Sequence, residues 1–311
     1  MFDTTFFTIW RAALADLVSG PDLASNTASI GIMAGFAILA GPISSTLVGA
    51  FAGQANSPRV CFLIAGMSTA LNVGLLQAKF EETLPAKDRK PVRLEDANPF
   101  SFLKLLNHSW ASFTLMCTAV LQTLPEGRNI MATNYLYMSQ GLGWAPGKVN
   151  GFISALGISL VFSALIVKKS IARLGLDGHT TMSNIVQTLG FIVWGNAGNM
   201  APYFGGSSEV GVLMAIGLMV PGGRKRDGVE AMLNDIGVKA GFGRGYISAA
   251  LMNWRAISNV FAPLIFGNIY SWATTAPRMN HGLVFTVMGL TQLLAEVVFR
   301  TLSKKQMGLE D

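Results

Sequence analysis

Residues 28–54 read ASIGIMAGFAILAGPISSTLVGAFAGQ, a stretch of 27 residues without a charged side chain. A helix of about 20 apolar residues crosses the ~30 Å hydrocarbon core of a bilayer, so this stretch predicts a membrane-spanning helix. Gly41 and Pro42 near its middle favour a bend, because proline removes a backbone donor. The small residues around them predict that a neighbouring helix packs closely against this one.

Residues 246–272, YISAALMNWRAISNVFAPLIFGNIYSW, have a similar plan near the other end of the chain. Ala262 and Pro263 stand at the depth that Gly41 and Pro42 occupy in the first stretch. The two stretches share little identity beyond the proline, so the likeness is one of pattern. Internal repeats of this kind are typical of secondary transporters.

The composition predicts an all-α, polytopic membrane protein. Of the 311 residues, 51% are hydrophobic and 13% are charged, whereas soluble domains carry roughly 25% charge. The apolar residues gather in runs that predict eight transmembrane helices. Two of these runs contain a single charge, Arg255 or Glu296, and the third run is interrupted by Glu126 and Arg128. These runs are residues 28–54, 60–78, 109–125 continuing as 129–147, 149–167, 180–208, 210–223, 246–272 and 281–299.

The net charge of +6 is explained by the distribution of the cations between loops. With residue 28 at the cytoplasm, eighteen of the 23 Lys and Arg residues fall in cytoplasmic segments and three in outer loops. The other two, Arg128 and Arg255, lie within spans. Cytoplasmic loops of membrane proteins carry an excess of Lys and Arg, so the pattern predicts that both termini are cytoplasmic. The cations Arg224, Lys225 and Arg226 are interpreted as marking the inner membrane surface rather than a nucleic-acid site.

A charged central segment divides the predicted spans two plus six. We therefore expect a cytoplasmic N-terminal segment, two helices, a cytoplasmic linker with three prolines, six further helices and a cytoplasmic tail. The corresponding ranges are 1–27, 28–80, 81–107, 108–303 and 304–311.

The chain resembles the major facilitator superfamily of transporters, and within it the drug- and tetracycline-efflux-like branch. The similar residues follow the family's order from its fifth helix, through its central loop, to its eleventh helix. They are Ala40-Gly41-Pro42, Phe62-Leu63-Ile64-Ala65-Gly66 with Leu71-Asn72, Leu84-Pro85, Asn98-Pro99-Phe100, Arg255-Ala256-Ile257 and Ala262-Pro263-Leu264-Ile265-Phe266-Gly267.

The resemblance implies a partial fold. The family has two six-helix halves, so this chain would hold two helices of the first half and all six of the second, and lack about the first four. The sequence also departs from the family. Ser44 and Ser45 stand where the efflux branch usually has glycines, and Asp177 and His179 replace the basic pair expected after Arg173-Leu174-Gly175.

Charges inside a membrane span are costly and usually face a cavity or a partner. Glu126 and Arg128 interrupt the third span between Pro125 and Asn129, which predicts a broken helix of the kind that holds transporter sites. We expect the substrate cavity to include Glu126, Arg128, Asn129, Asn134 and Tyr135. The alternative is a local salt bridge at the outer membrane interface, because residues 109–141 would form a helix longer than the bilayer.

Two further charges within spans, Arg255 and Glu296, are candidates for gating or structural roles, together with Gly41, Pro42 and Pro263. Arg255 could pair with an acidic residue of a cytoplasmic loop, bind an anionic group, or extend to the inner interface. Glu296 stands four residues before Arg300, the spacing of a helical ion pair, and is also a candidate for proton coupling.

No constellation of catalytic or metal-ligating residues is visible in the sequence. Cys61 and Cys117 form no disulfide framework, and the three histidines are scattered at the edges of spans. We therefore expect no enzyme activity, no metal, no cofactor and no nucleic-acid partner.

The leading hypothesis is a secondary active transporter of a small solute, complete or truncated, that works by alternating access in a lipid bilayer. Coupling to protons stays open. The alternative is a truncated membrane protein that does not transport and instead associates with, or regulates, a partner.

Overall fold

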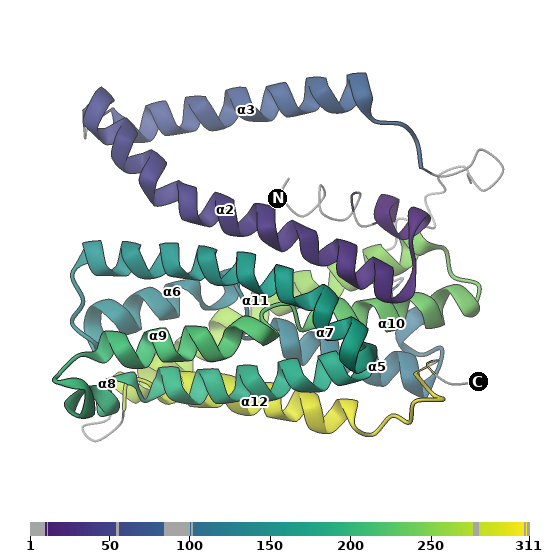
Figure 1. The fold of residues 1–311 in the computed structure, drawn as a ribbon. Coiled ribbons are helices and arrows are strands. Elements are labelled where there is room, and N and C mark those ends of the chain that lie inside the picture. Colours follow the sequence, from purple (N-terminus) through teal and green to yellow (C-terminus); the bar gives the residue numbers. More distant parts are fainter. Residues whose placement is uncertain are drawn as a thin grey trace.

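The computed structural model describes residues 10, 12–53, 56–83, 100, 102–275, 280–307 and 309. Within these ranges the regular elements are helices and no strand occurs, which confirms the prediction of an all-α fold (Figure 1). The elements, in chain order, are α2 (Gly20–Ala52), α3 (Ser57–Lys79), α4 (Phe102–Leu106), α5 (Trp110–Thr123), α6 (Arg128–Leu136), η3 (Tyr137–Gly141), α7 (Pro146–Gly195), α8 (Ala197–Met200), η4 (Ala201–Phe204), α9 (Ser208–Met219), η5 (Val220–Gly222), α10 (Arg226–Lys239), α11 (Arg244–Thr275) and α12 (Leu283–Phe299).

Among the described residues, three helices are long and apolar enough to cross a bilayer: α2, α3 and α7. The bent pair formed by residues 197–204 and 208–239 would be a fourth. α7 consists of two helical arms that meet at Gly175, where φ is 74° and ψ is 178°. A side chain would disfavour this conformation, so glycine permits the chain to reverse here. The predicted number of eight spans stays a prediction.

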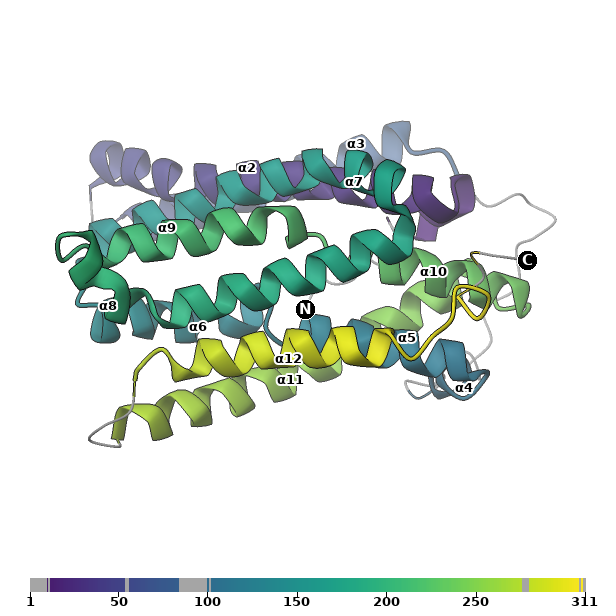
Figure 2. The ribbon, with the colours of Figure 1, turned by 60° about the horizontal axis from the view of Figure 1, so that its bottom comes forward.

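The helix that follows α9 corrects the sequence analysis. The apolar run was expected to end at Gly223 and to be followed by a cytoplasmic segment, but η5 leads into α10, which is packed in the core. Asp227 and Glu230 on α10 are only 5% and 4% exposed. Figure 2 shows α10 following α9 along the bundle. Lys225 is 3% exposed and the side chains of Arg224 and Arg226 are 15% and 16% exposed, so the interpretation of these cations as markers of the membrane surface is wrong.

α2 and the first arm of α7 cross in close contact. A Cβ atom added to Gly35 would lie 2.6 Å from the carbonyl oxygen of Gly157, and one added to Gly157 would lie 2.7 Å from that of Gly35. Gly41 itself meets nothing within 4 Å, while the close packing predicted from the small residues of this stretch is present. The contact occurs six residues earlier, and α2 and α11 continue as helices through Pro42 and Pro263.

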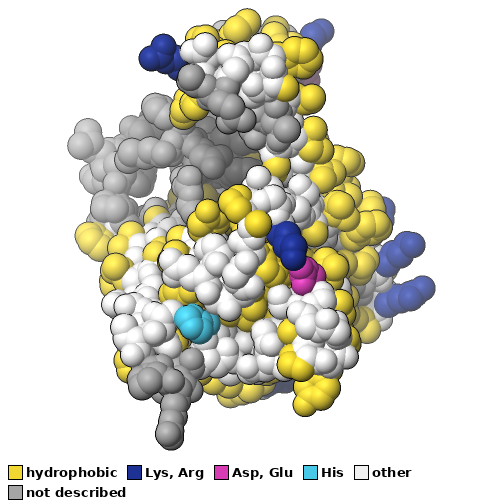
Figure 3. Space-filling view, turned by 90° about the vertical axis from the view of Figure 1, so that its left-hand side faces the viewer, with side chains coloured by type: hydrophobic (Ala, Val, Ile, Leu, Met, Phe, Trp, Pro, Cys, Tyr) yellow, Lys and Arg dark blue, Asp and Glu magenta, His cyan; other side chains and the backbone are white. Residues whose placement is uncertain are grey.

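α3 lies beside α2 and buries none of its residues (Figure 1). Its apolar side chains, such as Phe62 and Met67, are exposed. Figure 3 looks onto the left-hand end of the molecule in Figure 1, and few of the side chains drawn in colour there are charged. An apolar perimeter with an end that is poor in charge is the surface expected of a protein that lies in a bilayer.

Candidate functional site

The first helix after the central segment is broken between α5 and α6. α5 ends at Thr123 and α6 begins at Arg128, while Gly127 has φ 52° and ψ −120°. The break leaves carbonyl groups without helical partners. Asn129 compensates for one of them, since its Nδ2 donates to the carbonyl oxygen of Thr123 at 3.0 Å. The predicted broken helix is thus present, and its ends are stabilised by a residue that was predicted to belong to the site.

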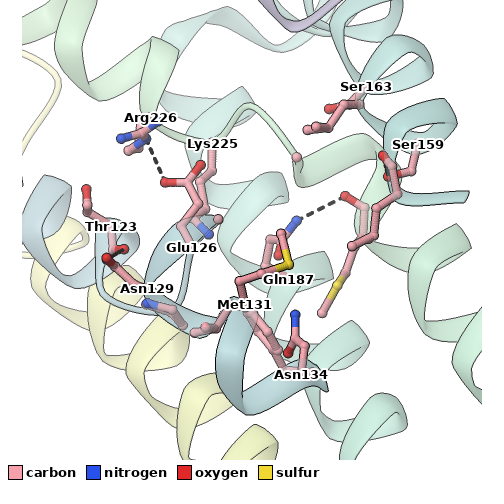
Figure 4. Close-up of a pocket in the computed structure, with 18 of the residues that line it drawn as sticks. Thr123, Glu126, Asn129, Met131, Asn134, Ser159, Ser163, Gln187, Lys225 and Arg226 are labelled. Carbon is pink, nitrogen blue, oxygen red and sulfur yellow. Dashed lines mark hydrogen bonds and ion pairs between the residues drawn. The ribbon is translucent and has the colours of Figure 1, made fainter. Parts of the chain in front are cut away.

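A pocket of about 480 Å³ lies at this break (Figure 4). Its lining comes from residues 123–134, from both arms of α7, from the link between α9 and α10, from α11 and from Ile38 of α2. One hydrophobic cluster contains Leu115, Met232 and Leu251, and a second contains Ile130, Val212 and Phe266. The two clusters occupy successive parts of α5–α6, of α9–α10 and of α11. Apart from Asn134, the polar lining residues of these elements lie between the two clusters.

Three cations and one carboxylate line the pocket. Glu126 forms an ion pair with Arg226, with 2.9 Å between Oε2 and Nε. Arg255 forms a second ion pair with Glu230, with 3.4 Å between Nη2 and Oε1. The third cation, Lys225, is only 3% exposed and has no ion pair among the described residues. The pocket therefore carries an excess of positive charge, because Glu126, the carboxylate near Lys225, is already paired with Arg226.

The structure brings together four of the residues predicted for the cavity or its gate: Glu126, Asn129, Asn134 and Arg255. The side chain of Arg128 lies outside the described residues. Glu126 faces the interior of the bundle, and its described ion-pair partner comes from the α9–α10 link. The roles of these residues in binding stay predictions.

Tyr135 is not among the residues that line this pocket, and its place in the predicted cavity set stays a prediction. Its side chain is 51% exposed. Successive residues of an α-helix point about 100° apart. When Asn134 faces the pocket, Tyr135 is rotated away from it.

Glu296 is also absent from the pocket lining. Its Oε1 pairs with Nε of Arg300 at 2.7 Å, as the spacing predicts, and its Oε2 accepts a hydrogen bond from Asn184 at 2.9 Å. Gln122 in turn donates to Oδ1 of Asn184 at 2.8 Å. These bonds join α5, α7 and α12. Proton coupling by Glu296 stays a prediction.

Lys225 and Arg226 were not predicted to line the pocket. The sequence does carry a signal for them, because the three consecutive cations of residues 224–226 divide a segment, 208–239, that is long enough to span a bilayer. The lining residues of α7 were not predicted either, because Gln187, Phe191 and Trp194 belong to an uninterrupted apolar run and carry no local mark of a site.

No protein-family model matches the chain. Curated relatives do match it at low identity. Hippocampus abundant transcript-like protein 1 from Bos taurus is 23% identical over 275 residues, which is 87% of this chain and 52% of that protein. Hippocampus abundant transcript 1 protein from Mus musculus is 26% identical over 136 residues, or 42% of this chain and 28% of that protein. The chain thus spans about half the length, or less, of these relatives.

A solved structure gives the clearest comparison. The human organic anion transporter MFSD10 superposes with a TM-score of 0.67 over 94% of this chain and 67% of that chain, at 18% sequence identity. At this identity the likeness shows the fold, and it does not select the drug- and tetracycline-efflux branch. The chain has the helical fold of this transporter, that of an integral, multi-pass membrane protein, and this fold agrees with the resemblance to the major facilitator superfamily found in the sequence.

Proposed function

We propose that the chain forms the substrate-binding part of a secondary transporter that moves a small organic anion across a membrane by alternating access. The observation that carries this proposal is Lys225, a buried cation in the pocket with no ion-pair partner among the described residues. The structural neighbour MFSD10 is an organic anion transporter, which agrees with this choice of substrate.

The charges around the pocket favour an anion over a cation. A buried charge is costly unless another charge or hydrogen bonds compensate for it. Arg226 and Arg255 already have Glu126 and Glu230 as partners, whereas Lys225 has none among the described residues. A carboxylate or a similar group on the substrate would supply the missing partner. A cationic substrate would instead have to compete with Arg226 for Glu126 and would face Lys225 beside it.

The surrounding architecture is part of the same proposal. We propose that eight helical spans lie in the bilayer. They are α2, α3, the broken pair α5–α6, the two arms of α7, the pair α9–α10, α11 and α12. The chain would then hold two helices of the first six-helix half and the complete second half. The alternative, a truncated protein that does not transport, has no observation of its own among the described residues in its favour. Proton coupling and membership of the efflux branch stay predictions.

The test is the affinity of the purified chain for an aromatic carboxylate, biphenyl-4-carboxylate, measured by calorimetry in detergent. We expect Lys225→Met to weaken binding about 10- to 100-fold, because a hydrogen bond to a charged group contributes about 1.5–3 kcal/mol. Lys148→Met is the matched control, since Lys148 pairs with Glu209 on the surface and does not line the pocket. Equal affinities of the wild type and Lys225→Met would contradict the proposal.

Orientation gives a separate prediction. Without Arg224, Lys225 and Arg226, fifteen cations still lie in segments predicted to be cytoplasmic, against three outside. In a variant with Cys61 and Cys117 replaced by alanine, Tyr203→Cys should react with a membrane-impermeant maleimide on intact cells. Lys239→Cys and Lys305→Cys should react only after permeabilisation. The reverse pattern would show that the orientation is inverted.

A further inference from the structure

Several buried polar groups of the pocket lack hydrogen-bond partners among the described residues, and the ion pairs described above do not account for them. They are Oδ1 of Asn129, Oδ1 of Asn134, Oγ of Ser163 and Nε1 of Trp194. Asn134 is 3% exposed, and its side-chain amide makes no hydrogen bond with the described residues. Trp194 is 2% exposed, and its Nε1 has no acceptor there. A buried polar group without a partner costs about 1–3 kcal/mol, so such groups are rare in folded proteins.

Other polar residues of the lining are already satisfied by the backbone. The hydroxyl of Ser159 donates to the carbonyl oxygen of Leu156 at 2.8 Å, and that of Thr123 donates to Ala119 at 2.7 Å. Gln187 donates from Nε2 to the carbonyl oxygen of Met219 at 3.0 Å. These three side chains therefore have less to offer a ligand than Asn134 and Trp194 have.

The region between the cations and Asn134 is apolar. In the view of Figure 4 the side chain of Met131 lies between Lys225 and Asn134. Met219 and Phe191 also line the pocket. Methionine is flexible and polarisable and makes favourable contacts with aromatic rings, so these walls can adapt to a flat apolar group.

We infer that the pocket binds an amphipathic anion that carries a hydroxyl or amide group at the end opposite its charge. The anionic group lies at Lys225, an aromatic or apolar middle lies against Met131, Met219 and Phe191, and the distal polar group hydrogen-bonds to Asn134. Asn134 Oδ1 would accept from the hydroxyl or amide N–H of that group, and Nε1 of Trp194 supplies a donor for the same end. This inference rests on the proposed function, since it assigns the anionic group to Lys225, but it adds Asn134 as the residue that selects among anions.

The test uses two matched pairs of probes on the purified chain. One pair is biphenyl-4-carboxylate and 4′-hydroxybiphenyl-4-carboxylate, and the other is 2-naphthoate and 6-hydroxy-2-naphthoate. We expect the hydroxylated member of at least one pair to bind about five- to tenfold more tightly, the effect of one hydrogen bond to an otherwise unpaired group. Asn134→Leu, which has a similar volume, should abolish this preference, so that the two members of each pair bind with equal affinity.

Ser159→Ala is the matched control, because Ser159 lines the pocket but already donates to Leu156. It should keep the full preference for the hydroxylated probe. Tight binding without any preference in the wild type, or a preference that survives in Asn134→Leu, would overturn the inference and leave the anion proposal intact. If no probe of either pair binds to the wild type, the anion proposal itself fails, and this inference fails with it.

Discussion

Gly157→Ala should destabilise the protein by about 1–3 kcal/mol, the cost of overfilling a close-packed contact. The added methyl group would lie 2.7 Å from the carbonyl oxygen of Gly35 and 2.8 Å from the amide nitrogen of Leu39. Both are backbone atoms of α2, so no side chain can rotate out of the way. α2 would have to move away from α7, and Ile38 would move with it out of the pocket wall.

Gly151→Ala is the control, because Gly151 lies on the same arm of α7 and meets nothing within 4 Å. Alanine is favoured over glycine inside a helix by about 1 kcal/mol, so this variant should be as stable as the wild type or slightly more stable. The thermal midpoints of both variants in detergent provide the measurement. A similar midpoint for the two variants would contradict the close crossing of α2 and α7.

The helices whose apolar runs are uninterrupted could be predicted well from the sequence. The runs 28–54 and 60–78 correspond to α2 and α3, because a long apolar segment in a membrane protein has few alternatives to a helix. The contact between helices was harder to predict. Gly35 and Gly41 look alike in the sequence, and only the direction in which each faces decides that Gly35 meets α7.

The end of α9 could not be predicted from hydropathy. A cation after an apolar run normally marks the membrane surface, and Arg224 meets that description. Here the charges are compensated within the bundle, since Arg224 pairs with Asp227 and Arg226 pairs with Glu126. The pair of Arg226 and Glu126 joins residues far apart in the sequence, so no local pattern reveals that this charge is compensated. The three-residue spacing of Arg224 and Asp227, in contrast, is visible in the sequence.

The candidate site could be predicted only in part, because a charge is recognised as unusual in the sequence only where it interrupts a predicted span. Glu126 and Arg255 stood out because a charge inside a span needs an explanation, and the structure places both at the pocket. Lys225 was assigned to a loop and so lost its significance. Asn134 and Tyr135 were equally plausible as neighbours, and the rotation of α6 separates them.

Asp227→Ala should be among the most destabilising single substitutions in α10. Asp227 accepts two hydrogen bonds from Arg224, at 2.7 Å from Nε and 3.0 Å from an Nη atom, and the same guanidinium donates to the carbonyl oxygen of Thr27 at 3.0 Å. The side chains of the pair are only 15% and 5% exposed. Removing the carboxylate leaves a largely buried guanidinium without its counter-charge, which typically costs about 3–5 kcal/mol.

The comparison that isolates burial is Glu209→Ala, because Glu209 forms an ion pair with Lys148 in which the side chains are 34% and 59% exposed. Exposed ion pairs contribute about 0–1 kcal/mol, so this variant should unfold close to the wild-type temperature while Asp227→Ala unfolds well below it. Replacing both partners, as in Arg224→Met with Asp227→Leu, should recover much of the loss, since no buried charge then remains. If Asp227→Ala is no less stable than Glu209→Ala, Arg224 is not held in the bundle by Asp227. α2 would then be held against α10 by contacts other than the bond from Arg224 to Thr27.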